Sequence, residues 1–294
     1  MNPKGIRPVT IASICGPKDD PAAILRLVEE AAKNKPDLIL LPENWQDCSF
    51  ETLGSETIGR LRVIAAEHGV YIVHATVLAD GKKFFNTTLL IDRAGDIAGR
   101  YDKAYPYWEE FTEGLPAPVS PGQSECVFAC DFGRIGIAIC FDANFPLVWA
   151  EMARRGAELV LWSSAYAAGY QLAAHALNHH YPIVTATNTG HCMVFDLDGR
   201  RILSTQSPGL HIEYVSLDLD RCIFHENFNQ EKLAALLAED PRRVEIEKHF
   251  PEEQWIIVRS AMPEQSAREC CAQAGMEELR AYKRRSKEVI DWLR

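Results

Sequence analysis

The sequence lacks several features that would place it in a broad class at once. No apolar run approaches the roughly 18 residues that a membrane-spanning helix needs. No Gly-x-Gly-x-x-Gly or P-loop pattern appears, so we expect no nucleotide cofactor and, more generally, no cofactor. Positive charge is in deficit: 31 Lys and Arg stand against 41 Asp and Glu, a formal net charge of −10. This balance argues against nucleic acid and anionic membranes as partners.

A disulfide framework and a metal site are also unsupported by the pattern of cysteines and histidines. The nine cysteines follow no repeating spacing. Cys126, Cys130 and the pair Cys270-Cys271 have no Cys/His partners at zinc spacing, so we interpret them as structural. Residues 1–8 contain no apolar segment typical of a signal peptide. We therefore expect a cytoplasmic protein, in which a reducing environment keeps a thiol usable.

His175 and His179 are four residues apart, a spacing found in metal sites on helices. Ala176 follows His175 where a His-Glu-x-x-His motif would carry glutamate, and no third ligand is evident. We expect a solvated or interface helix face here and predict no metal site.

The order of predicted elements indicates the fold class. Apolar, β-branched runs predict strands at 9–14, 38–43, 70–77, 85–92, 97–101, 136–139, 159–164, 183–188, 192–196, 201–205 and 213–219. Helical spacing of apolar residues predicts a helix that begins at Asp20-Pro21 and stops at Pro36-Asp37, and further helices over 57–68, 147–155 and 170–180. Helices alternate with strands in each half, with hairpins between. This pattern predicts an α/β fold, an α-β-β-α sandwich of two mixed sheets with helices outside.

The chain changes character near residue 221. Charge-rich helical segments are predicted at 231–239 and 264–293, interrupted by Pro241, Pro251 and Pro263. Only 254–258, Gln-Trp-Ile-Ile-Val, resembles an apolar strand. We therefore divide the chain into a domain over 1–220 and a helical C-terminal extension over 221–294. An extension unable to form its own core must pack on something. We expect it to dock on a dimer partner, with an appendage on its own subunit as the alternative.

Three polar residues follow or close predicted strands, and each alone has an ordinary explanation. Cys140 ends the buried run 136–139, where a free cysteine is often only a small buried hydrophobe. Glu43 closes the strand Leu-Ile-Leu-Leu-Pro-Glu, where a carboxylate usually points into water. Lys103 precedes an aromatic-rich loop and by itself would be a solvated charge. Strand ends are, however, where α/β folds place reacting groups.

Together, Glu43, Lys103 and Cys140 in this order resemble the nitrilase, or carbon–nitrogen hydrolase, superfamily. The resemblance extends from about Val9 to Leu219. Its flanking pieces are Pro121-Gly122, the segment 155–160, Asn188-Thr-Gly and Asp198-Gly199. It implies the same α-β-β-α sandwich, and an extension that family members commonly use across a dimer interface, so we expect a homodimer or higher homo-oligomer.

The chemistry of these residue types suits hydrolysis through a thioester. A thiolate is a strong nucleophile, but a free thiol is mostly protonated near neutral pH, so Cys140 needs a base, for which Glu43 is the candidate. Lys103 and the backbone N–H of Phe141 are candidates to stabilise the oxyanion. A cysteine peptidase would require a catalytic histidine, and none lies at a comparable strand end.

The resemblance also implies a second glutamate between the lysine and Pro121-Gly122. Glu109, Glu110 and Glu113 compete for this role. In relatives of this branch the glutamate lies four residues before a glycine, which Glu110 satisfies relative to Gly114. We therefore predict Glu110, with Glu113 as the second choice.

The substrate class is indicated only by the surroundings of the nucleophile. Nitrile-cleaving members typically carry Cys-Trp-Glu, whereas Cys140-Phe141-Asp142 resembles the amidase and N-carbamoyl hydrolase branches. We predict a small amide or N-carbamoyl substrate. A nitrilase and a non-catalytic binding or scaffold protein are the alternatives. The aromatic residues that could line a substrate pocket, or equally belong to the core, are Tyr105, Tyr107, Trp108, Trp162 and Tyr166.

Overall fold

A computed structural model describes residues 8–18, 20–46, 50–112, 115–262 and 264–294. The chain divides into two compact units, Val9–Ser216 and a second formed by Leu217–Arg294 with Met1–Pro8. In the described residues, no helix is both long and apolar enough to cross a membrane.

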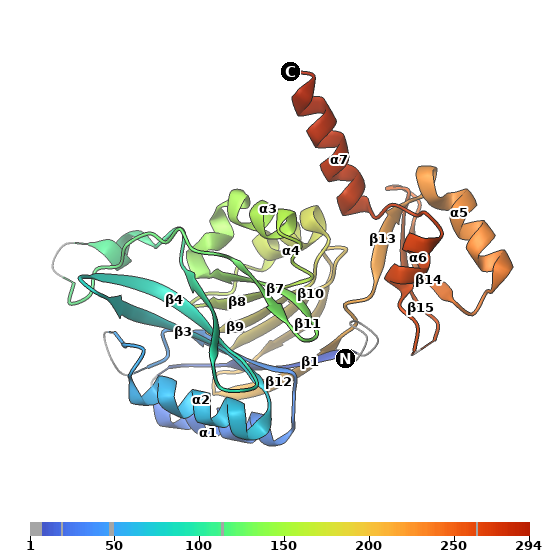
Figure 1. The fold of residues 1–294 in the computed structure, drawn as a ribbon. Coiled ribbons are helices and arrows are strands. Elements are labelled where there is room, and N and C mark those ends of the chain that lie inside the picture. Colours follow the sequence, from blue (N-terminus) through green and yellow to red (C-terminus); the bar gives the residue numbers. More distant parts are fainter. Residues whose placement is uncertain (1–7, 19, 47–49, 113–114, 263) are drawn as a thin grey trace. The chain divides into compact units, whose positions relative to one another are not determined.

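The first unit contains two six-stranded sheets (Figure 1). One has the order β12-β1-β2-β3-β4-β5 and the other β11-β10-β9-β8-β7-β6. The strands of the first sheet are β1 (Val9–Cys15), β2 (Leu38–Glu43), β3 (Tyr71–Asp80), β4 (Lys83–Ile91), β5 (Ile97–Asp102) and β12 (His211–Leu217). Those of the second are β6 (Val127–Cys130), β7 (Gly133–Ile139), β8 (Leu159–Ser164), β9 (Ile183–Thr187), β10 (His191–Phe195) and β11 (Arg201–Gln206).

Both sheets are mixed. β1, β2 and β3 run parallel, as do β7, β8 and β9, whereas the hairpin partners pair antiparallel. Buried hydrogen bonds join the sheets where their central strands face each other: Ser13 Oγ donates to the Thr185 carbonyl (2.7 Å), and Ser163 Oγ to the Leu41 carbonyl (2.7 Å). The predicted sandwich of two mixed sheets is confirmed.

Helices cover the outer faces of the sandwich (Figure 1). They are α1 (Pro21–Lys33) and α2 (Glu56–His68) on one side, and α3 (Pro146–Arg154) and α4 (Gly169–His179) on the other. The start of α1 follows from its sequence, because the Asp20 carboxylate accepts the Ala23 N–H (2.9 Å) and Pro21 fills the first turn. Pro146 likewise occupies the first turn of α3, where Phe145 at the N-cap provides no side-chain hydrogen bond.

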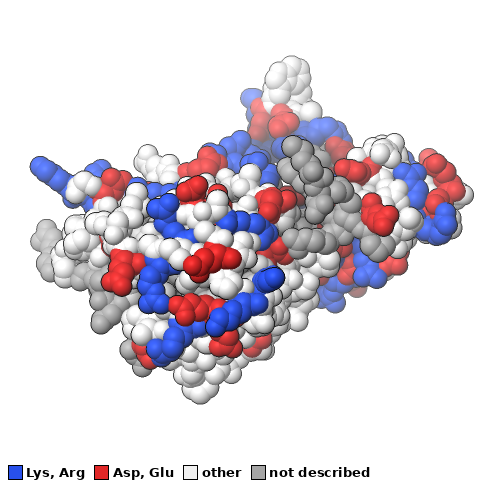
Figure 2. Space-filling view, turned by 60° about the horizontal axis from the view of Figure 1, so that its bottom comes forward, with Lys and Arg blue, Asp and Glu red and all other residues white. Residues whose placement is uncertain are grey.

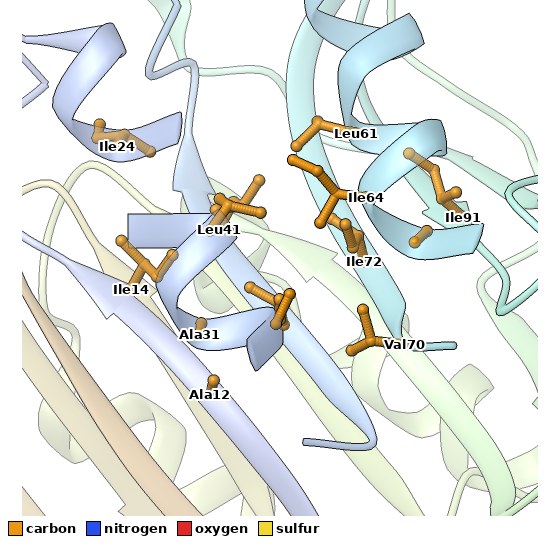
Figure 3. Close-up of a cluster of buried hydrophobic side chains, with 14 of the residues drawn as sticks. Ala12, Ile14, Ile24, Ala31, Leu41, Leu61, Ile64, Val70, Ile72 and Ile91 are labelled. Atoms are coloured by element: carbon orange, nitrogen blue, oxygen red, sulfur yellow. The ribbon is translucent and has the colours of Figure 1, made fainter. Parts of the chain in front are cut away.

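A cluster of aliphatic side chains fills the layer between α1, α2 and the first sheet (Figure 3). Ile24 and Ala31 of α1 and Leu61 and Ile64 of α2 pack with strand residues such as Ile72. On the solvent side, Arg60 and Glu29 form an exposed ion pair at 2.7 Å. Figure 2 shows basic and acidic side chains interspersed over the face it presents, so the excess of negative charge does not gather there in one patch.

The second unit differs from the sequence-based expectation. It contains a three-stranded sheet, β13-β15-β14, and three helices. Their bounds are β13 (Cys222–His225), α5 (Glu226–Glu239), β14 (Val244–Phe250), β15 (Trp255–Ser260), α6 (Ala267–Gln273) and α7 (Leu279–Trp292). The predicted helix 264–293 is two helices, since Gly275 adopts a positive φ of 70° between them. Strands β13 and β14 were not predicted, because charged residues interrupt the apolar pattern of β14.

The expectation that this segment cannot form its own core is wrong. Phe224, Leu233, Ile256 and Cys270 are buried together from four different elements. The apolar patch of the predicted docking arm contributes Ile256 and Val258 to this core, which are 3% and 0% exposed. Pairing on both sides makes β15 the central strand, so its apolar residues are used within the unit.

The layer under α2 allows a stability test within one helix. Leu61→Ala should lower the free energy of unfolding by about 2–5 kcal/mol, because it leaves a cavity among packed aliphatic groups. Val63→Ala on the same helix, where Val63 is 54% exposed, should change it by less than about 0.5 kcal/mol. Urea unfolding followed by circular dichroism measures both. Equal losses in the two variants would contradict the packing described here.

Candidate active site

Glu43 ends β2 in a buried position, 4% exposed. Its Oε2 accepts the backbone N–H of Ala165 (3.0 Å), beyond the end of β8 in the opposite sheet. Its backbone carbonyl accepts from Asn188 Nδ2 (2.7 Å), just after β9. The first sheet therefore supplies the carboxylate and the second sheet helps to orient it.

Lys103 directly follows β5 and is also buried, 1% exposed. The backbone N–H of Lys103 donates to the backbone carbonyl of Asn86 on β4 (2.8 Å). The backbone carbonyl of Lys103 accepts the N–H of Gly122 (2.8 Å). A Cβ at position 122 would lie 2.2 Å from the Asp102 carbonyl oxygen, so this close approach requires glycine. The Pro121-Gly122 pair thus helps to position the lysine.

The Lys103 ammonium lies between two carboxylates. Its Nζ is 3.0 Å from Glu43 Oε1 and 2.7 Å from Glu110 Oε2. Burial alone would lower the pKa of Lys103, but the charges of Glu43, Cys140 and Glu110 outweigh it and raise that pKa. Lys103 consequently remains a cation near neutral pH and is unsuited to act as a base or a nucleophile.

Glu110, the residue predicted as the second glutamate, lies in the short 3-10 helix Trp108–Phe111, and its carboxylate contacts Lys103. Its Oε2 also accepts the N–H of Tyr107 (2.6 Å). Glu109 is exposed at the cavity rim. The second choice, Glu113, lies outside the described residues.

Cys140 follows β7 at the start of a 3-10 helix, Cys140–Asn144. Its φ of 42° lies in the left-handed region, which is uncommon for a side chain other than glycine and marks a sharp turn. The indole N–H of Trp162 donates to its carbonyl (3.2 Å). Burial, together with the charge of Glu43, raises the pKa of the Cys140 thiol to about 12, although Lys103 opposes this. The resting thiol is therefore protonated and needs a base for attack.

The side chains of the candidate site line one cavity of about 630 Å³. Polar side chains from segments beyond the strand ends also line it, namely Lys18, Asn44, Asn144, Gln171 of α4 and Asn188. Glu43, Lys103, Glu110 and Cys140 line it as well, so the structure brings together all four predicted catalytic residues. A cavity of this size, which combines Tyr107, Phe141 and Tyr166 with a few polar groups, suits a small-molecule ligand.

Only some of the aromatic residues predicted to line a substrate pocket do so. Tyr107, Phe141 and Tyr166 line the cavity. Trp108 does not belong to the described lining and is 56% exposed. Trp162 is fully buried and supports Cys140 from the core side rather than facing a ligand.

Tyr105, also considered for the pocket, stacks on Phe145 with ring centroids 3.7 Å apart. Together with Trp108 and Trp162 it shows the limit of the prediction. Residue type indicated an aromatic neighbourhood, but not which rings face the cavity.

The histidine pair is part of the packing around α4. Of the expected solvated or interface face, the solvated alternative is wrong for His175, which is buried, stacks on Trp149 (ring centroids 4.3 Å apart) and shares a hydrogen bond with the Ala143 carbonyl (2.8 Å). Among the described residues, no group of three or more His, Cys, Asp or Glu is arranged to hold a metal ion. Cys126, Cys130, Cys270 and Cys271 are buried free thiols.

Asn86 is the principal site residue that sequence reasoning missed. Its Nδ2 donates to Glu43 Oε1 (2.7 Å) and to Glu110 Oε1 (2.5 Å), and so joins the two carboxylates on either side of Lys103. An asparagine inside a predicted strand carries no signal of its own, because only the fold places β4 beside Glu43. Asn188 was noted as part of a flanking motif, but its bond to Glu43 was not foreseen.

Comparison with known proteins agrees with this geometry. The carbon-nitrogen hydrolase family profile matches residues 20–224. The chain belongs to the carbon-nitrogen hydrolase family. Among related sequences, a Pyrococcus abyssi protein called nitrilase is 29% identical over 180 residues, covering 56% of this chain and 67% of that protein. A Synechocystis protein called deaminated glutathione amidase is 26% identical over 238 residues, covering 65% and 84%.

Solved structures share the fold at low identity. Saccharomyces cerevisiae Nit3, a member of the nitrilase superfamily, superposes with a TM-score of 0.62 at 19% identity, over 76% of this chain and 94% of Nit3. The amidase from Nesterenkonia sp. AN1 superposes with a TM-score of 0.61 at 20% identity, over 74% of this chain and 93% of the amidase. That structure was solved with acrylamide, as a double mutant in which a glutamate and a cysteine are replaced. The similarity covers only part of some relatives: the chain spans 58% of a Mycobacterium tuberculosis hydrolase and 48% of a Dictyostelium discoideum nitrilase homolog.

The role of Asn86 can be tested by Asn86→Leu, which keeps the number and branching of the side chain's heavy atoms and removes both hydrogen bonds. Without Asn86 to link the Glu43 and Glu110 carboxylates, the Lys103 ammonium should no longer be held in its position. The value of kcat should therefore fall by about 10²-fold. KM should change little, because Asn86 does not contribute to the described cavity lining. Steady-state kinetics on an amide substrate measure both. Asn227→Leu, in α5 of the second unit, is the control, and a kcat for Asn86→Leu equal to that of the control would refute the role.

Proposed function

We propose that this protein hydrolyses small-molecule amides through a cysteine thioester, with Cys140 as nucleophile, Glu43 as base and Lys103 as oxyanion partner. The observation that carries this proposal is the buried Lys103 ammonium, held between Glu43 and Glu110 in the cavity that Cys140 also lines. This arrangement supplies a nucleophile, a proton acceptor and a fixed positive charge within one cavity.

In the proposed first half-reaction, Glu43 accepts the thiol proton as Cys140 Sγ attacks the amide carbon. The carbonyl oxygen becomes an oxyanion facing Lys103 and the backbone N–H of Phe141, where preplaced donors are most effective. The intermediate collapses as the C–N bond breaks, and the proton on Glu43 passes to the leaving nitrogen. Ammonia or an amine departs, and a thioester remains on Cys140.

In the second half-reaction Glu43 takes a proton from water, which attacks the thioester carbon. Collapse of this intermediate breaks the C–S bond, returns the proton to the thiolate and releases the carboxylic acid. Glu110 and Asn86 remain in place throughout and hold Lys103 toward the reacting oxygen. A reducing compartment such as the cytoplasm suits this cycle, because oxidation would remove the nucleophile.

Amides are favoured as substrates by the Cys140-Phe141-Asp142 sequence and by two similar proteins whose names describe amidases. The Pyrococcus abyssi relative is called a nitrilase, so nitriles belong in the same test. N-Carbamoyl compounds stay a prediction from the sequence.

The test is a panel of amides, N-carbamoyl amino acids, ureido acids and nitriles, assayed by ammonia release. We expect turnover on amides by the wild type and loss of several orders of magnitude in Cys140→Ala, with unchanged circular dichroism. Intact-mass spectrometry on a slow substrate should show an acyl adduct on the wild type alone. Turnover by the alanine variant would exclude Cys140 as nucleophile, and activity confined to nitriles would favour the nitrilase alternative.

We also propose that the C-terminal unit docks on a second copy of the chain. The surface concerned is the end of α7, where Val289, Ile290, Trp292 and Leu293 are 49–83% exposed on an otherwise charged helix. Exposed apolar groups of this kind are typical of interaction sites. We propose this surface for docking instead of the segment 255–258, because residues of that segment are buried in the core of the unit.

Light scattering at micromolar concentration tests this proposal. The wild type should have the mass of a dimer or a larger assembly, and the double substitution Ile290→Ser with Trp292→Ser should shift it toward the monomer by removing apolar contact area. Val63→Ser, at an exposed position of α2, should leave the measured mass unchanged. A monomeric wild type, or an unaffected double variant, would contradict docking through α7.

A further inference from the structure

Asp142 is a buried carboxylate that the proposed mechanism does not use. It lies two residues after Cys140, within the turn Cys140–Asn144, and is 0% exposed. It does not belong to the described lining of the cavity, so it is not placed to touch a substrate there. Burying a carboxylate is costly unless hydrogen bonds compensate it, so its partners indicate what it does.

Those partners come from two separate segments. Oδ2 accepts the N–H of Ile139 (3.0 Å), the residue directly before the nucleophile. The same oxygen accepts the hydroxyl of Tyr101 (2.7 Å), and Oδ1 accepts the N–H of Tyr105 (3.0 Å). Tyr101 and Tyr105 lie two residues before and two residues after Lys103. One carboxylate therefore holds both the backbone before Cys140 and both sides of the segment that carries Lys103.

We propose that Asp142 is a positioning residue that keeps the Cys140 thiol and the Lys103 ammonium in register. This inference rests on the proposed roles of those two residues. Cys140 follows β7 of one sheet and Lys103 follows β5 of the other, so no strand pairing joins them. Asp142 provides a direct hydrogen-bonded link between the two segments.

The turn that carries Cys140 needs such support. A φ of 42° at a cysteine is strained and persists only where surrounding contacts determine it. Trp149 Nε1 donates to the Asp142 carbonyl (3.0 Å), and Trp162 Nε1 to the Cys140 carbonyl (3.2 Å), so two indoles hold the turn from the core. The Asp142 side chain adds the link toward the lysine, which neither indole provides.

The test compares Asp142→Asn with Tyr101→Phe. An amide in place of the carboxylate must turn its NH₂ toward one of the two N–H donors, so one link is lost at nearly constant volume. Misplacing the reacting groups should lower kcat by about 10²-fold in Asp142→Asn, with KM changed by less than about twofold. Tyr101→Phe removes one of three hydrogen bonds and should give a smaller loss. Asp196→Asn, a buried carboxylate between β10 and β11, is the control and should retain the wild-type kcat.

A second readout does not depend on the substrate. Lys103 favours the thiolate of Cys140, so displacing the two groups should slow alkylation of Cys140 by iodoacetamide by about tenfold, measured by peptide mapping. The wild type could prove to hydrolyse no amide while Asp142→Asn is still alkylated more slowly than the wild type. That result would support the positioning role and show that the proposed function is wrong. Unchanged kcat and alkylation with a lowered Tm would show Asp142 to be structural only and overturn the proposal. If Asp142→Asn fails to fold, Tyr101→Phe decides between the same outcomes.

Discussion

The arrangement of the site depends on the burial of one ammonium group. Lys103 is 1% exposed, and its Nζ lies 3.0 Å from Glu43 and 2.7 Å from Glu110. Removing one partner of such a buried ion pair typically costs about 3–5 kcal/mol, because the other charge is left uncompensated. The two carboxylates, the lysine and Asn86 therefore form a unit in which each position constrains the others. A preorganised positive charge of this kind is what an oxyanion intermediate requires.

The sandwich makes this burial possible. Glu43 and Lys103 come from the first sheet and Cys140 from the second, and each follows or ends a strand. Because buried hydrogen bonds between Ser13 and Thr185 and between Ser163 and Leu41 join the central strands, the ends of the two sheets meet at one cavity. The loops beyond these ends carry polar side chains, so the scaffold holds the reacting groups while the loops shape the space for a ligand.

The second unit illustrates a different use of apolar sequence. Its strand β15 looked like a single docking patch in a charged segment, but pairing with β13 and β14 makes it the centre of a small sheet. The buried residues from four elements form a core, and the exposed apolar groups lie instead near the end of α7. Strands β13 and β14 pair with the two edges of β15, and α5 and α6 contribute side chains to the core that contains Ile256 and Val258. The charged residues of β14 concealed this arrangement in the sequence.

The sequence by itself determined the alternation of strands and helices, and hence the sandwich, because hydrophobic period and caps are local properties. The sequence also indicated the candidates Glu43, Lys103 and Cys140, because their order resembles that of the carbon–nitrogen hydrolases. The same resemblance favoured Glu110 through its distance from Gly114. Only the tertiary structure decided that Asn86 joins two carboxylates, that Asp142 links the nucleophile to the lysine segment, and that Trp162 lies beneath the site while Tyr107 faces the cavity. These relations join residues far apart in the chain. A side chain's partners across two packed sheets depend on strand order and register, which no local pattern encodes.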